Sequence, residues 1–104
     1  MSASFAYMWE YRVSPERLDE FKSVYGPRGD WASLFSRAEG YARTELFQDA
    51  DDERRFITTD LWSTREARDA FRAKFAEAFD ALDARCQALT LSERFVGDFT
   101  VIAS

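Results

Sequence analysis

The sequence predicts an α+β fold in which a four-stranded antiparallel sheet carries helices on one face. Two kinds of periodicity support this prediction. Side chains alternate between apolar and polar, or between two bulky faces, over residues 4–13, 41–49, 54–63 and 93–102, as in strands. Apolar residues recur at helical spacing over 15–25 and 64–89. The order strand, helix, strand, strand, helix, strand is that of the ferredoxin-like fold.

The length and composition indicate one globular domain spanning residues 1–104. The chain has 104 residues, of which 46% are hydrophobic and 16% aromatic. Ten Phe, four Tyr and three Trp are more aromatic side chains than a single small core readily hides. This surplus predicts a ligand pocket or a subunit interface.

The charge pattern excludes several kinds of partner. The net charge is −5 and the arginines are scattered, whereas nucleic acids and membrane surfaces are bound by a contiguous basic face. No apolar run approaches the roughly 20 residues that span a bilayer, and the N-terminal stretch does not resemble a secretory leader. The single cysteine, Cys86, cannot form an internal disulfide. We therefore expect a cytoplasmic protein.

The absence of two residue types narrows the possible chemistry. The sequence contains no His and no Asn, so nucleophile pairs that depend on His, and the commonest metal ligand, are excluded. We expect no bound metal. Carboxylates, tyrosines, two lysines and Cys86 remain as candidates for acid–base work.

The first strand and the segment after it supply most of the candidate aromatic wall. One face of residues 4–13 carries a row of large side chains: Phe5, Tyr7, Trp9, Tyr11 and Val13. Pro15 begins the first helix, and the segment Gly26–Gly29 ends it. A short helical turn over 30–37 then places Trp31 either as a cover for the core or as a lid over a binding site.

A hairpin joins the second and third strands through the acidic turn Asp49–Glu53. Matching of side chains predicts that Tyr41 faces Trp62 and that Arg43 faces Asp60. The same register gives three further pairs: Phe47 with Phe56, Leu46 with Ile57, and Ala42 with Leu61. The Arg43–Asp60 pair is either an ion pair within the sheet or a charged group that acts on a ligand.

The third strand runs directly into the long second helix, predicted over 64–89. Ser63 is expected to cap this helix, with Glu66 three residues later. Trp62, the last large side chain of the strand, either fills the junction of sheet and helix or forms the floor of a pocket. The apolar stripe of the helix includes Phe75. The last strand spans 93–102, and Gly97 within it indicates a bulge.

Helices can cover only one face of this sheet, yet both faces carry apolar or bulky residues. The uncovered face should therefore meet another sheet. A homodimer with its two sheets face to face satisfies this requirement, and it would form a dimeric α/β barrel.

Several stretches resemble the antibiotic biosynthesis monooxygenase-like family of dimeric α/β-barrel proteins. The resemblance covers nearly the whole chain, and its sharpest element is the Trp62–Ser63 entry into a helix. The matching stretches are Tyr41–Phe47, Phe56–Ser63, Leu89–Glu93 and Gly97–Phe99.

The resemblance implies a cofactor-free oxidation. Relatives of this kind oxidise aromatic polyketides to quinones, and the electron-rich substrate itself reduces oxygen within an apolar pocket. Other relatives degrade haem with an Asn, a Trp and a His. Trp62 matches the family's Trp, while the Asn position falls near Tyr11 and the His position near Arg72. We therefore expect neither haem nor flavin.

The first hypothesis is a cofactor-independent monooxygenase for a hydrophobic aromatic metabolite. Its catalytic residues would be Trp62, Arg43, Tyr11 and Asp60, and its substrate-binding residues would be Tyr41, Trp9, Trp31 and Phe75. Arg43 would offset negative charge, and Tyr11 or Asp60 would move a proton. The alternative is a non-catalytic dimer that binds a small molecule or assists another enzyme, with these aromatic residues serving as core packing. An interaction module using a free sheet face is a third possibility and requires a monomer.

Overall fold

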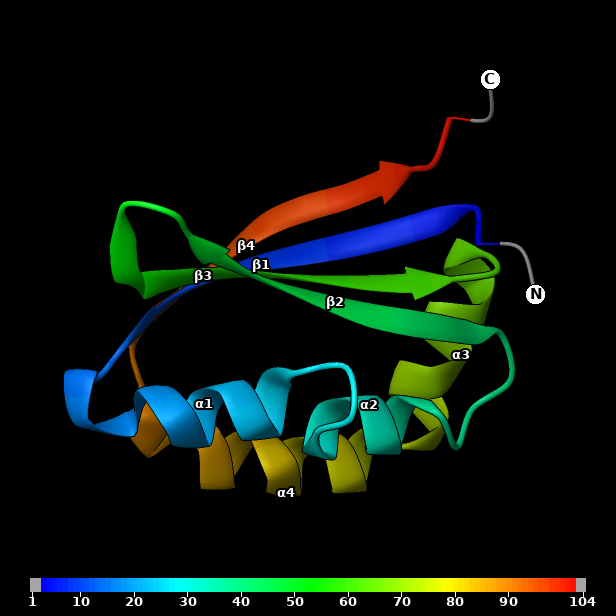
Figure 1. Cartoon of the computed structure of the whole chain (residues 1–104). Coiled ribbons are helices and arrows are strands. Elements are labelled where there is room, and N and C mark those ends of the chain that lie inside the picture. Colours follow the sequence, from blue (N-terminus) through cyan, green and yellow to red (C-terminus); the bar gives the residue numbers. More distant parts are fainter. Residues whose placement is uncertain (1–2, 103–104) are drawn as a thin grey trace.

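The computed structural model describes residues 3–102 and has two layers, a sheet and a layer of helices (Figure 1). The strands are β1 (Phe5–Val13), β2 (Tyr41–Asp49), β3 (Asp52–Trp62) and β4 (Thr90–Thr100). The helices are α1 (Leu18–Tyr25), α2 (Asp30–Phe35), α3 (Arg65–Lys74) and α4 (Ala76–Cys86). Two short 3₁₀ turns, Pro15–Arg17 and Gln87–Leu89, lead into α1 and out of α4.

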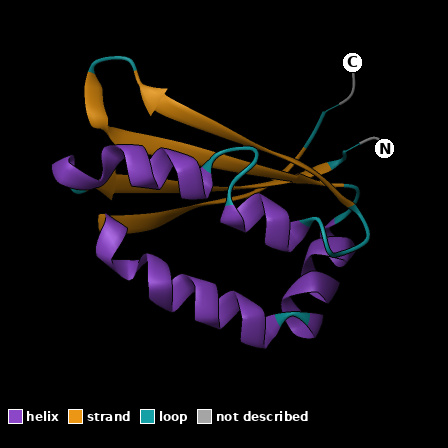
Figure 2. Ribbon diagram, turned by 60° about the horizontal axis from the view of Figure 1, so that its bottom comes forward, coloured by secondary structure: helices purple, strands orange, loops and turns teal. Residues whose placement is uncertain are grey.

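The sheet is antiparallel throughout, with strand order β2-β3-β1-β4. All four helices lie on one side of it, which leaves the other face uncovered (Figure 2). The predicted α+β, ferredoxin-like fold class is confirmed. No helix in the described part of the chain has the length and apolar character needed to cross a membrane.

The second helical segment differs from the prediction of one continuous helix. The backbone of Phe75 leaves the helical region (φ −109°, ψ 24°), so α3 ends there and α4 begins in a new direction (Figure 2). The turn brings α4 beside α2, where the Phe79 ring meets Trp31 with centroids 5.0 Å apart. The cap of α3 is Thr64 rather than Ser63: the Thr64 hydroxyl accepts a hydrogen bond from the Ala67 amide at 3.1 Å.

A β-bulge at the start of β2 changes the predicted hairpin register. Tyr41 faces Trp62 as predicted, but a register shift follows, and Arg43 then pairs with Leu61. Asp60 instead faces Thr44. The predicted Arg43–Asp60 pair is therefore wrong.

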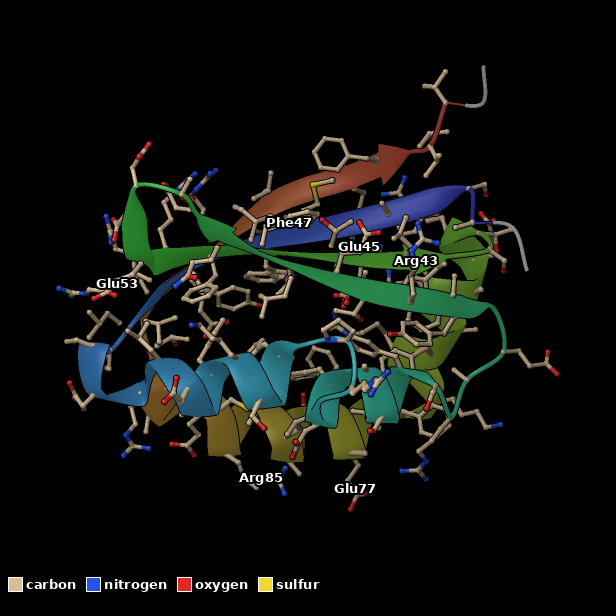
Figure 3. All side chains as sticks on the ribbon, viewed as in Figure 1. Arg43, Glu45, Phe47, Glu53, Glu77 and Arg85 are labelled. Atoms are coloured by element: carbon tan, nitrogen blue, oxygen red, sulfur yellow. The ribbon has the colours of Figure 1, made fainter. Side chains whose placement is uncertain are left out.

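The bulge also exchanges the two faces of β2 beyond Tyr41. The other predicted pairs are replaced by three observed pairs: Phe47 with Ile57, Leu46 with Thr58, and Gln48 with Phe56. Arg43, Glu45 and Phe47 project from the side of β2 away from the helices (Figure 3). Thr44 and Leu46, which alternate with them along the strand, face the helices.

The predicted bulge at Gly97 is confirmed. Met8 pairs with Gly97 and Trp9 with Phe95, so Val96 has no partner in the ladder. Gly97 has φ 153°, and a Cβ at this position would lie 3.2 Å from the Phe99 ring. Glycine therefore fits both the backbone conformation and the close approach.

The core at one end of the sheet is an aromatic cluster around Trp62, which is completely buried. Its ring lies 5.4 Å from those of Tyr41 and Phe71 and 5.8 Å from that of Phe35, measured between centroids. Trp62 therefore fills the junction of sheet and helix.

Candidate functional site

A cavity of about 450 Å³ lies between the sheet and the helices, next to the aromatic cluster around Trp62. This volume is within the usual range for small-molecule sites. Half of its fourteen lining residues are aromatic, and the other half are polar or charged. The lining residues are Tyr7, Trp9, Tyr11, Tyr25, Trp31, Phe35, Thr44, Thr58, Asp60, Arg72, Phe79, Asp80, Asp83 and Glu93.

Asp60 is the buried charged group of this cavity, with only 5% of its surface exposed. The Thr44 hydroxyl donates a hydrogen bond to Asp60 Oδ1 at 2.7 Å. The Tyr41 hydroxyl lies 2.8 Å from Thr44 Oγ1. Because Thr44 gives its single proton to Asp60, Tyr41 is the donor to Thr44. The three residues form a chain that orients the carboxyl group.

Burial raises the pKa of Asp60 to about 7, although the hydrogen bond from Thr44 lowers it in part. A buried carboxylate loses the solvation of its charge, and no described cation lies close enough to compensate. Asp60 therefore exchanges its proton near neutral pH. A general base works best with a pKa in this range.

On the neighbouring strand β1, Tyr7 faces Asp60, and Tyr11 lies four residues further along the same face, opposite Phe56. Burial and the charge of Asp60 both raise the pKa of each phenol well above its ordinary value. Both side chains therefore keep their protons at neutral pH. They can donate hydrogen bonds to a ligand oxygen, but they cannot serve as bases there.

Arg72, on α3, is the cation among the residues that line the cavity. Its guanidinium carbon lies 4.1 Å from the centroid of the Phe79 ring. Its charge also favours the ionised form of Tyr7 and so opposes the upward shift of the pKa of that phenol. A cation is thus present at the cavity, supplied by a helix rather than by β2.

Four of the eight predicted site residues line the cavity: Trp9, Tyr11, Trp31 and Asp60. Trp62 and Tyr41 lie one layer behind its wall, because both pack against Phe35, which lines it. Within the described residues the Trp62 indole nitrogen has no acceptor. Trp62 and Tyr41 therefore support the cavity without forming its surface.

The remaining two predicted residues lie elsewhere. Arg43 faces the opposite side of the sheet and pairs with Glu45, with a nitrogen–oxygen distance of 3.1 Å. Phe75 lies beside a separate pocket between α3 and the loop before β2, where the Arg37 guanidinium carbon is 5.0 Å from its ring centroid. The bulge displaces Arg43, and the break between α3 and α4 displaces Phe75.

Thr44 and Arg72 were not among the predicted site residues, and Tyr7 was predicted only as a member of the aromatic row. Tyr7 lies in the aromatic row of the first strand with Trp9 and Tyr11, and this alternation indicated that the three side chains share one face. Thr44 reaches the cavity only because of the bulge. Arg72 lay off the apolar stripe, and the one pointer to it was the resemblance that placed the family's His nearby.

The sequence also matches a known protein family. The sequence profile described as antibiotic biosynthesis monooxygenase matches residues 4–85. The chain therefore belongs to the antibiotic biosynthesis monooxygenase family. A comparison with curated proteins finds no significant match.

Solved structures share this fold at low sequence identity. A mutant form of SnoaB, a cofactor-independent oxygenase from Streptomyces nogalater, has 22% identity, a TM-score of 0.74, and coverage of 99% of this chain and 97% of its own. A dimeric ferredoxin-like protein from an uncultured marine organism has 14% identity and a TM-score of 0.70, covering 99% of this chain and 91% of its own. At these identities the likeness establishes the fold alone.

Proposed function

We propose that this protein is a cofactor-independent monooxygenase that oxidises a planar, hydroxylated aromatic metabolite. The observation that carries the proposal is Asp60, a buried carboxyl group with a pKa near 7 that opens on an aromatic cavity. Membership of the monooxygenase family and the likeness to SnoaB support the same activity.

The first step is removal of a phenolic proton by Asp60. A free phenol has a pKa near 10, so its deprotonation at neutral pH needs a positioned base. Thr44 holds the carboxyl group through Oδ1, which leaves Oδ2 for the substrate. The hydroxyl group of Tyr7, which faces Asp60 across the ladder, can donate a hydrogen bond to the phenolate oxygen as its charge develops.

The second step is oxidation of the electron-rich phenolate by molecular oxygen. One electron passes from the phenolate to oxygen, and the resulting radical pair combines into a peroxide anion at a ring carbon. The proton that Asp60 took in the first step then converts this anion into a hydroperoxide. Loss of water from the hydroperoxide leaves a carbonyl group. For an anthrone, the sum is a CH₂ group plus O₂ giving C=O plus H₂O. Arg72 offsets the negative charge that oxygen acquires, the role first expected of Arg43.

The substrate-binding assignment keeps Trp9 and Trp31 as walls against which a ring system stacks. Trp62 and Tyr41 hold those walls in place through Phe35. Trp62 is thus a positioning residue, because its ring lies behind the cavity surface and supports the residues that form it. Phe75 is left out of the site.

We further propose that the protein is a homodimer joined through the uncovered sheet face. That face carries Phe47 and Phe99, which are 52% and 41% exposed in the single chain. Exposed aromatic groups of this size favour burial against a partner. The dimeric ferredoxin-like structure from an uncultured marine organism supports the dimeric state.

A binding protein without catalysis is the alternative. It is favoured by the complete burial of Trp62, and by Tyr11 and Arg72, which occupy the positions near the Asn and His of catalytic relatives. A binding protein would need the aromatic cavity but not the proton chemistry of Asp60.

Oxygen consumption separates the two. Purified protein should be supplied with anthrone-type and dihydroxynaphthalene substrates and no added cofactor. We expect turnover, a fall in kcat of about 10²–10⁴-fold for Asp60→Asn, and a smaller loss for Trp62→Phe. Asp51→Asn, in the exposed hairpin turn, is the control and should match wild type. Binding of these compounds without oxygen uptake would instead establish the binding protein.

A further inference from the structure

Acidic side chains lie at both ends of the cavity. At the inner end, Asp60 faces Tyr7 across the β1–β3 ladder. At the other end, Glu93 on β4 faces Tyr11, and Asp83 of α4 lines the same cavity. Aromatic side chains of β1, α2 and α4 separate the two ends. A ligand that fills the cavity therefore meets a polar group at each end.

The acids at the outer end have no cationic partner. Asp80, Asp83 and Glu93 take part in none of the ion pairs found among residues 3–102. Burial and the charge of Asp83 together raise the pKa of Glu93, as expected for two neighbouring carboxylates. Arg72 acts on Tyr7 instead. The outer end is thus acidic, and its carboxylates have no ion-pair partner within 4.0 Å among residues 3–102.

Buried polar groups inside the cavity also lack partners. The Trp31 side chain is 7% exposed, and its indole N–H has no acceptor among the described residues. Asp60 accepts a hydrogen bond from Thr44 through Oδ1 alone, although a carboxylate can accept about four. Buried donors and acceptors in native proteins are normally satisfied. These groups point to a polar ligand within the same cavity.

We propose that the ligand of this cavity is a planar hydroxylated aromatic that carries a protonated amine, held between Asp83 and Glu93. The aromatic ring lies against Trp9, Trp31 and Phe79, and its hydroxyl group reaches Asp60. The inference rests on the proposed function and names its substrate class. A carboxylate at the same position would meet the two acids and be rejected.

Equilibrium binding tests the charge preference without depending on turnover. Three dihydroxynaphthalenes, bearing an aminomethyl, a hydroxymethyl or a carboxylate group at one position, should be titrated calorimetrically in the absence of oxygen. The variants are Asp83→Asn with Glu93→Gln, and Glu77→Gln as the control. Figure 3 shows Glu77 on the side of α4 away from the sheet.

We expect the amine to bind roughly tenfold more tightly than the carboxylate, with the hydroxymethyl compound between them. The double variant should lose most of this preference, and Glu77→Gln should keep it. Equal affinities, a preference that survives in the double variant, or no binding of any probe would overturn the inference. Binding with the expected preference but no oxygen uptake would leave it standing and refute the oxygenase function.

Discussion

Two parts of one interface between sheet and helices differ sharply, although they are built on the same strand. Trp62 and Asp60 are two residues apart on one face of β3. The cross-strand neighbours of Trp62 are Phe5 and Tyr41, and the space around it is filled. Asp60 has the small Thr44 on one side, and the space beside it is the cavity.

The difference shows how one face can serve both stability and function. Large side chains on three neighbouring strands close the interface at the Trp62 end. At the Asp60 end, the short side chains Thr44 and Thr58 leave room that the helices do not fill. The cavity thus follows from side-chain volume on β2 and β3, while the aromatic cluster supplies the rigid wall behind it.

The packed end should be the more sensitive of the two to loss of volume. Replacing Trp62 with alanine removes a fully buried ring from contact with Phe35, Tyr41 and Phe71. We expect the free energy of unfolding to fall by about 3–5 kcal/mol. Chemical denaturation measures this loss, with the exposed Glu77→Ala as the control. A loss below about 1 kcal/mol would contradict the assignment of Trp62 to the core.

At the cavity end, titration of Asp60 should make the free energy of unfolding depend on pH. The pKa of Asp60 is raised by burial to about 7, above the value near 3.9 of an unfolded chain. Between these pH values the folded state binds more protons, so its stability falls as pH rises from about 4 to about 7. The full effect is about 4 kcal/mol, and it is constant above that window.

Denaturation of wild type and Asp60→Asn at several pH values isolates this contribution. The stability of wild type should decline relative to the variant across the window, since the variant has no proton to lose at this position. A difference between the two proteins that does not change with pH would show that Asp60 titrates at an ordinary value.

A smaller change should follow from the hydrogen bond that tunes Asp60. In wild type, the hydrogen bond that Thr44 donates to Asp60 at 2.7 Å lowers the pKa of the carboxyl group. Thr44→Val removes this donor. We expect the pKa of Asp60 to rise further, by about one pH unit. Carbon-13 NMR titration of the carboxyl group measures it. Thr59→Val changes a buried threonine on the opposite face of β3 and should leave that pKa unchanged.

The fold was predictable because each element repeats its pattern over many residues. The alternation on β1 and the turn at Asp49–Glu53 correctly predicted the strands and the hairpin. The bulge after Tyr41 was not predictable, since the matching of side chains along the hairpin favoured a regular register. In the folded chain Arg43 stays hydrated on the outer face, whereas burial beside Asp60 would cost it solvation.

The candidate site was predictable only in part, because some of its residues are placed by packing rather than by a repeated pattern. Trp9, Tyr11, Trp31 and Asp60 lie on segments whose direction follows from the pattern. The place of Arg72 at the cavity depends on how α3 and α4 meet at Phe75. The apolar stripe continues from one helix to the next there, without a Gly or Pro to mark the break. Tertiary packing, rather than local sequence, fixes that break.

The bulge has a consequence for the divergence and redesign of this scaffold. It behaves like a frameshift in the sheet, because one extra residue near Ala42 decides which alternate set of β2 side chains faces the helices. Deleting that residue would leave Arg43 opposite Leu61 and Thr44 opposite Asp60 in a regular ladder, so the same set would still face the helices. Closing the bulge with every residue kept would instead bring in the set to which Arg43, Glu45 and Phe47 belong, without any substitution. A shift of register in β2, rather than a deletion, is therefore the change that would alter the lining of the cavity.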